Sequence, residues 1–292
     1  MTSPARIETA LQAALQAGEA PGCPSQLSAA LRHAVFPGGA RIRPQLCLAV
    51  ARACGDDAPA LADAAASAIE LLHCASLVHD DLPCFDDAPT RRGRPSVHSA
   101  FGERLAVLAG DALIVMAFQV LARAGADRPE RLAPVLSTIA GAVGTPVGIV
   151  AGQAWECESR VSVREYHREK TGSLFAAATL AGAQAAGGDA EAWRGLGEWL
   201  GEAYQVADDI RDVAASAQQL GKPIGRDAAL GRPSIARERG LPAALRYFDS
   251  LVRNAVDAVP EGRGAPMLRA LVRSEAERLV PHQMAAPLRA VA

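Results

Sequence analysis

The chain has 292 residues and a formal charge of -2 at pH 7, from 30 lysines and arginines against 32 aspartates and glutamates. This balance provides no overall positive field for nucleic acid or an anionic membrane, so any anion-binding site has to be local. With 50% hydrophobic and 21% charged residues, the composition also excludes an extended disordered chain.

Helix is the expected secondary structure throughout. The sequence contains 63 alanines but only 4% aromatic residues, and alanine favours helices while aromatic residues favour strands. Hydrophobic periodicity, interrupted where glycine and proline cluster, predicts helices at about 5–18, 25–35, 42–54, 58–81, 101–124, 129–143, 146–158, 163–187, 190–218, 241–258 and 265–280. The longest non-helical segments are expected at 88–100 and 221–233. Because no repeat and no long linker occurs, we predict one all-α domain over residues 1–292.

The N-terminal helix does not have the basic start and apolar run of a signal peptide, because Glu8 and Glu19 interrupt its apolar residues. The six cysteines fall outside any CxxC pattern, which favours reduced thiols and a cytoplasmic protein. The segment 132–155 carries no charge for 24 residues and is long enough to span a bilayer. The glycines and the proline near 144–146 favour a buried pair of helices there instead of a membrane span.

A first acidic cluster, His-Asp-Asp-Leu-Pro-Cys-Phe-Asp-Asp, occupies residues 79–87 at the end of an apolar helix. Pro83 disfavours helix in its own position and in the residue before it, so the helix is expected to end near Asp81, with Asp86 and Asp87 on the following turn. Four carboxylates at one helix end repel each other unless a cation neutralises them. Mg²⁺ is the natural candidate, because it takes one or two carboxylates together with waters and phosphate oxygens.

A second acidic cluster, Tyr-Gln-Val-Ala-Asp-Asp-Ile-Arg-Asp, lies within one predicted helix at residues 204–212. Asp208 and Asp212 are four residues apart and share one helix face, while Asp209 lies to the side. Either cluster alone is best interpreted as a solvated acidic helix end. Because both occur in apolar helices, the metal-binding interpretation is favoured for the pair.

Basic residues accompany both clusters. Three arginines, at 91, 92 and 94, follow the first cluster, and the arginine side chain presents a fork of donors suited to phosphate oxygens. Other basic residues near glycines are Arg41, Arg43, Lys170, Lys222 and Arg232. Carboxylates for a metal together with cations for phosphate predict a diphosphate substrate.

The ordered motifs resemble a known family. Asp-Asp-Leu-Pro-Cys-Phe-Asp-Asp followed by Arg-Arg-Gly, and later Gln-Val-Ala-Asp-Asp-Ile-Arg-Asp, are similar to the two aspartate-rich motifs of trans-polyprenyl diphosphate synthases. Gly-Gly-Ala-Arg-Ile-Arg-Pro, Lys-Thr-Gly and Gly-Lys-Pro-Ile-Gly-Arg-Asp also match in order, between about 36 and 233. Within the family, the chain is most similar to bacterial geranylgeranyl diphosphate synthases of carotenoid and photopigment pathways. The resemblance implies a single helical bundle of the isoprenoid synthase type with a central apolar cavity, and a homodimer.

The resemblance also implies residue roles. The expected ligands of about three Mg²⁺ ions are Asp80, Asp86 and Asp208. The supporting carboxylates are Asp81, Asp209 and Asp212. The allylic diphosphate is expected to contact Arg91, Lys170, Thr171, Gln205, Lys222 and Arg232. Isopentenyl diphosphate is expected to contact Arg43, His73 and Arg92. Small side chains at Ala75 and Ser76 imply a cavity deep enough for a C20 product.

The implied reaction is a Mg²⁺-dependent prenyl transfer from an allylic diphosphate to isopentenyl diphosphate. Two positions depart from the family pattern: Ala40 replaces a lysine, for which Arg41 or Arg43 is a possible substitute, and Arg232 replaces another lysine. Three alternatives stay open. These are a farnesyl diphosphate synthase with a C15 product, a terpene cyclase, and a non-catalytic partner subunit that binds prenyl diphosphates; the second motif and the Arg-Arg-Gly sequence argue against the cyclase.

Overall fold

The computed structural model describes residues 3–19, 21–36, 38–158, 168–214 and 234–280. The elements up to residue 124 are α1 (Ser3–Gly18), α2 (Ser25–Val35), α3 (Ile42–Ala53), α4 (Pro59–Asp80), β1 (Thr90–Arg91), β2 (Arg94–Pro95), α5 (Val97–Phe101) and α6 (Glu103–Ala124). The elements that follow are α7 (Pro129–Val143), α8 (Ile149–Ala154), η1 (Trp155–Cys157), η2 (Arg168–Gly172), α10 (Ser173–Ala185), η3 (Glu191–Trp193), α11 (Arg194–Ala214), α14 (Ile235–Arg239), α15 (Leu241–Asp257) and α16 (Ala265–Leu279).

The predicted all-α fold is confirmed, and most predicted helices begin and end within a few residues of the observed ones. The polar segment 88–100 differs from the prediction, because it contains the antiparallel pair β1 and β2 and the start of α5. Two strands of two residues each are too short to produce an alternating pattern in the sequence. The polar segment 221–233 lies outside the described residues.

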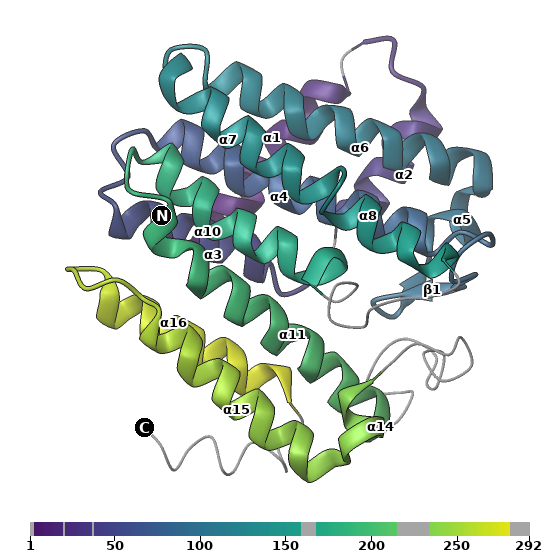
Figure 1. Ribbon diagram of the computed structural model, residues 1–292. Coiled ribbons are helices and arrows are strands. Elements are labelled where there is room, and N and C mark those ends of the chain that lie inside the picture. The colour runs from purple at the N-terminus through teal and green to yellow at the C-terminus, as the bar shows by residue number, and fades with distance from the viewer. Residues whose placement is uncertain (1–2, 20, 37, 159–167, 215–233, 281–292) are drawn as a thin grey trace.

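Helix α4 lies at the centre of the larger group of helices, where α3, α6 and α10 pack against it (Figure 1). Its sequence explains this position, because Glu70 is the only acidic or basic side chain other than histidine between Ala64 and Val78. Proline at its first residue suits a helix start. The alanines on its surface let neighbouring helices approach closely, so the aspartates at its end are carried by a well-buried element.

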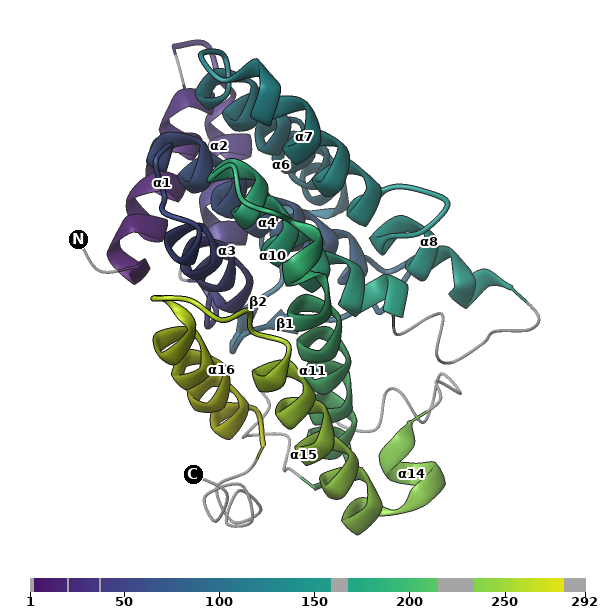
Figure 2. The ribbon, with the colours of Figure 1, turned by 60° about the vertical axis from the view of Figure 1, so that its left-hand side comes forward.

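Helix α11 connects two hydrophobic clusters. Its first half packs with α10 in the larger cluster, and its second half packs with α14 and α15 in the smaller one. Figure 2 shows α15 and α16 beside α11, with α16 also next to α3. Ile42 and Tyr204 pack against both clusters. The second acidic cluster therefore lies on the helix that runs from one cluster to the other.

The uncharged segment 132–155 is broken between Val143 and Ile149 into α7 and α8, as predicted. The expectation that the whole pair is buried is wrong, because Val147 and Val150 are about half exposed. Among the described residues, α4 and α6 are long and apolar enough to cross a bilayer by length and composition alone. The most apolar stretch of α4 is 78% buried, which is typical of a core helix in a globular protein, whereas that of α6 is 39% buried.

Candidate active site

The first acidic cluster forms a compact turn at the end of α4. The helix ends at Asp80, as the position of Pro83 predicts, and Asp81 is its C-cap. The backbone N–H of Asp86 donates to the Asp80 carbonyl at 2.9 Å, so the turn folds back over the helix end. Burial raises the pKa of Asp80, and the nearby charge of Asp86 raises it further while Lys170 lowers it. Asp80 and Asp86 thus lie within electrostatic reach of each other.

Asp81 and Arg91 form an ion pair beside this turn. The Asp81 side chain is almost fully buried, and Arg91 Nε donates to Asp81 Oδ1 at 3.0 Å. Burial would lower the pKa of the Arg91 guanidinium, but the hydrogen bond from Arg91 to Asp81 and the negative charges of Asp81 and Asp80 raise it above its usual value. The predicted allylic ligand Arg91 therefore pairs with the supporting carboxylate Asp81 and lies within electrostatic reach of the predicted metal ligands Asp80 and Asp86.

The second acidic cluster divides into one accessible and two buried carboxylates. Asp208 is partly exposed and accepts a hydrogen bond from Arg211 at 3.0 Å. Asp209 accepts the backbone N–H of Ile235 at 2.8 Å, and Asp212 pairs with Arg237, so both carboxylates bind α14 to α11. Of the three, Asp208 is the carboxylate best placed to reach an external ligand.

The short helix η2 contacts both acidic regions. Lys170 Nζ lies 3.9 Å from Asp80 Oδ1 and 2.6 Å from Glu156 Oε1. The next residue, Thr171, donates its hydroxyl to Gln205 Oε1 at 2.9 Å, and Gln205 lies three residues before Asp208 on α11. Consecutive residues of η2 therefore bring the end of α4 and the second acidic cluster to the same region.

A glycine permits this close arrangement of η2 and α11. A Cβ atom at Gly201 on α11 would lie 2.6 Å from the Cα of Gly172, which no side chain tolerates without displacement. Glu156 was not predicted as a site residue from the sequence, although its carboxylate holds Lys170. An acidic residue 14 positions before a lysine is no recognisable signal, and only the folded chain brings the two together.

Arg43, His73 and Arg92 also come together. The Arg43 guanidinium stacks on the Phe175 ring, with its carbon 4.3 Å from the ring centroid, and its Nε has no hydrogen-bond partner among the described residues. Burial lowers the pKa of Arg43. Loss of surrounding water lowers the pKa of His73 well below its usual value, and the charges of Arg43 and Arg92 lower it further, so the imidazole is neutral at pH 7.

Arg41 does not act as a substitute for the lysine that Ala40 replaces. Its guanidinium is buried, donating to Glu70 at 2.6 Å and to Glu8 at 2.8 Å. A Cβ atom at Gly38 would lie 2.0 Å from the guanidinium carbon, so glycine is required for Arg41 to fold back. Arg41 thus fixes the start of α3, and its guanidinium is engaged by Glu70 and Glu8.

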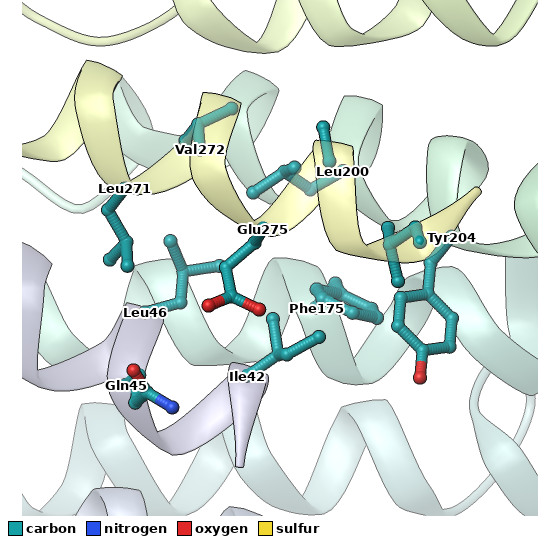
Figure 3. Close-up of a pocket in the computed structure, with 11 residues that line it drawn as sticks. Ile42, Gln45, Leu46, Phe175, Leu200, Tyr204, Leu271, Val272 and Glu275 are labelled. Atoms are coloured by element: carbon teal, nitrogen blue, oxygen red, sulfur yellow. The ribbon is translucent and has the colours of Figure 1, made fainter. Parts of the chain in front are cut away.

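A largely apolar cavity lies near the stacked Arg43 and Phe175 side chains, between α3, α10, α11 and α16 (Figure 3). Phe175 and Tyr204, whose rings lie near the Arg43 guanidinium, also line this cavity. The Glu275 carboxylate points into it, and its Oε2 has no partner among the described residues.

The residues proposed to set product length lie elsewhere, on α4. Ala75 is fully buried, and Ser76 donates its hydroxyl to the His73 carbonyl at 2.9 Å. The deep cavity expected beneath these two residues stays a prediction. Lys222 and Arg232 lie outside the described residues.

The donor set suits magnesium shared with a diphosphate. Within the described ranges, no three histidine, cysteine, aspartate or glutamate side chains are grouped closely enough to hold one ion by themselves. Mg²⁺ does not require such a cage, because it is held in proteins by one or two carboxylates together with waters and substrate phosphate oxygens. Asp80, Asp86 and Asp208 carry hard oxygen donors of this kind, and Lys170 and Arg91, which lie near Asp80, carry positive charge suited to phosphates.

The all-α architecture is shared with solved isoprenoid synthases. The chain belongs to the polyprenyl synthetase family, which it matches over residues 24–248. It is 55% identical to the geranylgeranyl diphosphate synthase of Cereibacter sphaeroides, over 96% of this chain and 98% of that protein.

Two solved structures share the fold over almost the whole chain. The geranyltransferase of Legionella pneumophila has a TM-score of 0.81 and 28% identity, and covers 95% of this chain and 94% of its own. The geranyltransferase of Helicobacter pylori, complexed with magnesium and isoprenyl diphosphate, has a TM-score of 0.77 and 26% identity. The match covers 96% of this chain and 98% of the geranyltransferase. The resemblance seen in the sequence motifs is therefore confirmed at the level of the family.

Proposed function

We propose that the protein condenses isopentenyl diphosphate with an allylic diphosphate and releases geranylgeranyl diphosphate, the C20 product. The observation that carries the proposal is the position of η2, where Lys170 lies beside Asp80 and Thr171 binds Gln205 next to the second acidic cluster. The 55% identity to a geranylgeranyl diphosphate synthase and the similarity to a solved geranyltransferase complexed with magnesium support it.

The allylic diphosphate is proposed to lie between Asp80, Asp86 and Asp208, with Arg91 and Lys170 contacting its phosphates. When bound, Mg²⁺ supplies positive charge that stabilises the departing diphosphate. The cationic side chains add to this stabilisation, because donors aimed at developing negative charge lower the barrier to C–O cleavage. Lys222 and Arg232 are proposed as further phosphate contacts by family resemblance.

Isopentenyl diphosphate is proposed to lie against Arg43, His73 and Arg92. The buried Arg43 has a donor without a partner among the described residues, and the neutral imidazole of His73 donates or accepts a hydrogen bond without adding charge. The double bond of this substrate attacks the allylic cation, and the proton then lost passes to the released diphosphate. The apolar surroundings of α4 exclude water that would otherwise quench the cation.

We further propose one domain over residues 1–292, a homodimer and a cytoplasmic enzyme of carotenoid biosynthesis. The adjoining hydrophobic clusters support the single domain. The exposed apolar side chains Val107, Leu108 and Val115 on α6 support self-association, because an apolar face of this kind is typical of a protein interface. Sedimentation at micromolar concentration should give twice the chain mass, and a charged substitution at Leu108 should shift it toward the monomer.

The test of function is incubation of the purified protein with Mg²⁺, isopentenyl diphosphate and either geranyl or farnesyl diphosphate, followed by mass spectrometry of the products. The proposal expects a C20 product from both primers and none after chelation of the metal. A C15 product from geranyl diphosphate, with no extension of farnesyl diphosphate, would instead identify a farnesyl diphosphate synthase. Binding without turnover would identify the non-catalytic partner subunit, which Ala40 favours by removing one expected cation.

A further inference from the structure

The hairpin β1–β2 carries the two arginines assigned to the two diphosphates, yet it has little stability of its own. Each strand has two residues, and the register pairs Arg91 with Arg94. Its turn residues, Arg92 and Gly93, have φ values of 54° and 74°. An isolated two-stranded hairpin is at best marginally stable in water, and a left-handed arginine adds strain. The surrounding structure must therefore hold the hairpin in place.

A small cavity borders the hairpin, lined by Leu77 and Val78 of α4 and by Arg91, Arg92 and Arg94. Because the hairpin is not packed tightly against α4 at this cavity, the polar contacts around it contribute to its position.

On the β1 side the contact is between Arg91 and Asp81. Both residues belong to the proposed allylic site, so this contact is part of the substrate-binding region itself. The β2 side is independent of the reacting groups. There Arg94 Nη1 donates to the Phe36 carbonyl at 2.8 Å, and Arg94 Nη2 lies 3.0 Å from His33 Nδ1.

His33, on α2, contacts the hairpin at two atoms. Besides its Nδ1 contact with Arg94, its Nε2 lies 2.8 Å from the Pro95 carbonyl. One neutral tautomer satisfies both contacts, because Nδ1 accepts from the guanidinium and Nε2–H donates to the carbonyl. The ring is also fixed edge-on against Phe101, with centroids 5.3 Å apart.

We propose that His33 is a positioning residue, which acts through Arg94 and the Pro95 carbonyl to hold the hairpin so that Arg91 and Arg92 meet the two diphosphates. This inference rests on the proposed function. His33 does not touch the substrates; its loss lets the hairpin move at the cavity that borders it. The expected consequence is weaker binding of both substrates and, because Arg91 also stabilises the departing diphosphate, slower turnover.

The test compares steady-state kinetics of the full chain with three variants. His33→Ala removes both contacts and should raise KM for each diphosphate roughly tenfold, the effect of about one hydrogen bond's net free energy, and should also lower kcat. His33→Asn retains an acceptor near the Nδ1 position and should recover most of the loss. Arg32→Gln is the matched control, because Arg32 is adjacent on α2 but pairs with Glu19, and its constants should not change.

Calorimetric titration of isopentenyl diphosphate into the same proteins repeats the comparison without turnover. A wild-type protein that binds but does not turn over refutes the proposed function and still reports on His33. The inference is overturned if folded His33→Ala binds and turns over both substrates like the wild type. It is equally overturned if kcat and melting temperature fall together and His33→Asn restores neither, since the residue is then only a structural one.

Discussion

The buried pair of Arg41 and Glu70 should be far more important for stability than the contact of Arg41 with Glu8. The side chains of Arg41 and Glu70 are 5% and 3% exposed, whereas that of Glu8 is 45% exposed. Removing one member of a buried ion pair leaves the other charge without compensation, which costs about 3–5 kcal/mol. Because Glu8 and the Val35 carbonyl still accept from Arg41, we expect the lower end, about 3 kcal/mol, for Glu70→Ala.

For a chain of this size, each kcal/mol lowers the melting temperature by roughly 2 °C, so Glu70→Ala should melt about 6 °C below the wild type. Glu8→Ala is the control, and as a largely exposed partner it should cost at most about 1 kcal/mol, or roughly 2 °C. Helix content followed by circular dichroism during heating, at two scan rates, measures both. Equal shifts for the two variants would refute the reasoning that burial of the Glu70 carboxylate determines the difference.

Three further outcomes are expected. Ala75→Tyr should shorten the main product from C20 to C15, as measured by mass spectrometry, and an unchanged product would contradict the assignment of cavity depth to this residue. Folding lowers the pKa of His73, so the unfolded chain takes up a proton at this histidine more readily than the folded protein does. The free energy of unfolding should therefore be unaffected by His73 above about pH 6.5 and should decrease as the pH falls below that value. His73→Gln should flatten that decline in melting temperature between about pH 6.5 and 5, and an unchanged slope would argue against it. Burial raises the pKa of the Cys74 thiol to about 12, so iodoacetamide at pH 8 should label the exposed Cys84 and leave Cys74 unmodified in peptide mass maps.

The helices and the end of α4 were predictable because their signals are local. Alanine content and periodicity depend on residues within one or two turns, and Pro83 acts on its own position and the preceding one. The continuous helix through Asp208 was predictable for the same reason, because its periodicity is a local signal. The hairpin β1–β2 was not predicted, because strands of two residues show no period in the sequence. Its turn residues Arg92 and Gly93 both have positive φ. Hairpin turns of that kind usually carry Asn-Gly, so the dipeptide Arg-Gly gives no recognisable turn signal.

The partners of individual site residues were not predictable, because they come from distant parts of the chain. Asp209 and Asp212 bind α14 residues 26 and 25 positions away. By its position next to Ala40, Arg41 is a candidate for the charge that Ala40 removes, and nothing in the sequence indicates that Glu70 neutralises it. His73 was assigned to the site from the family resemblance alone, since an isolated histidine on an apolar helix is more often a core residue.

The central claim is that the two acidic regions hold metal and diphosphate between them. It is tested most directly by anomalous diffraction from crystals grown with Mn²⁺, as a substitute for Mg²⁺, and a non-ionisable allylic diphosphate analogue. The account predicts metal peaks that join the diphosphate to Asp80 and Asp86 on one side and to Asp208 on the other, with Lys170 contacting the phosphates. Metal bound at only one acidic region, or at two regions with no diphosphate between them, would contradict it.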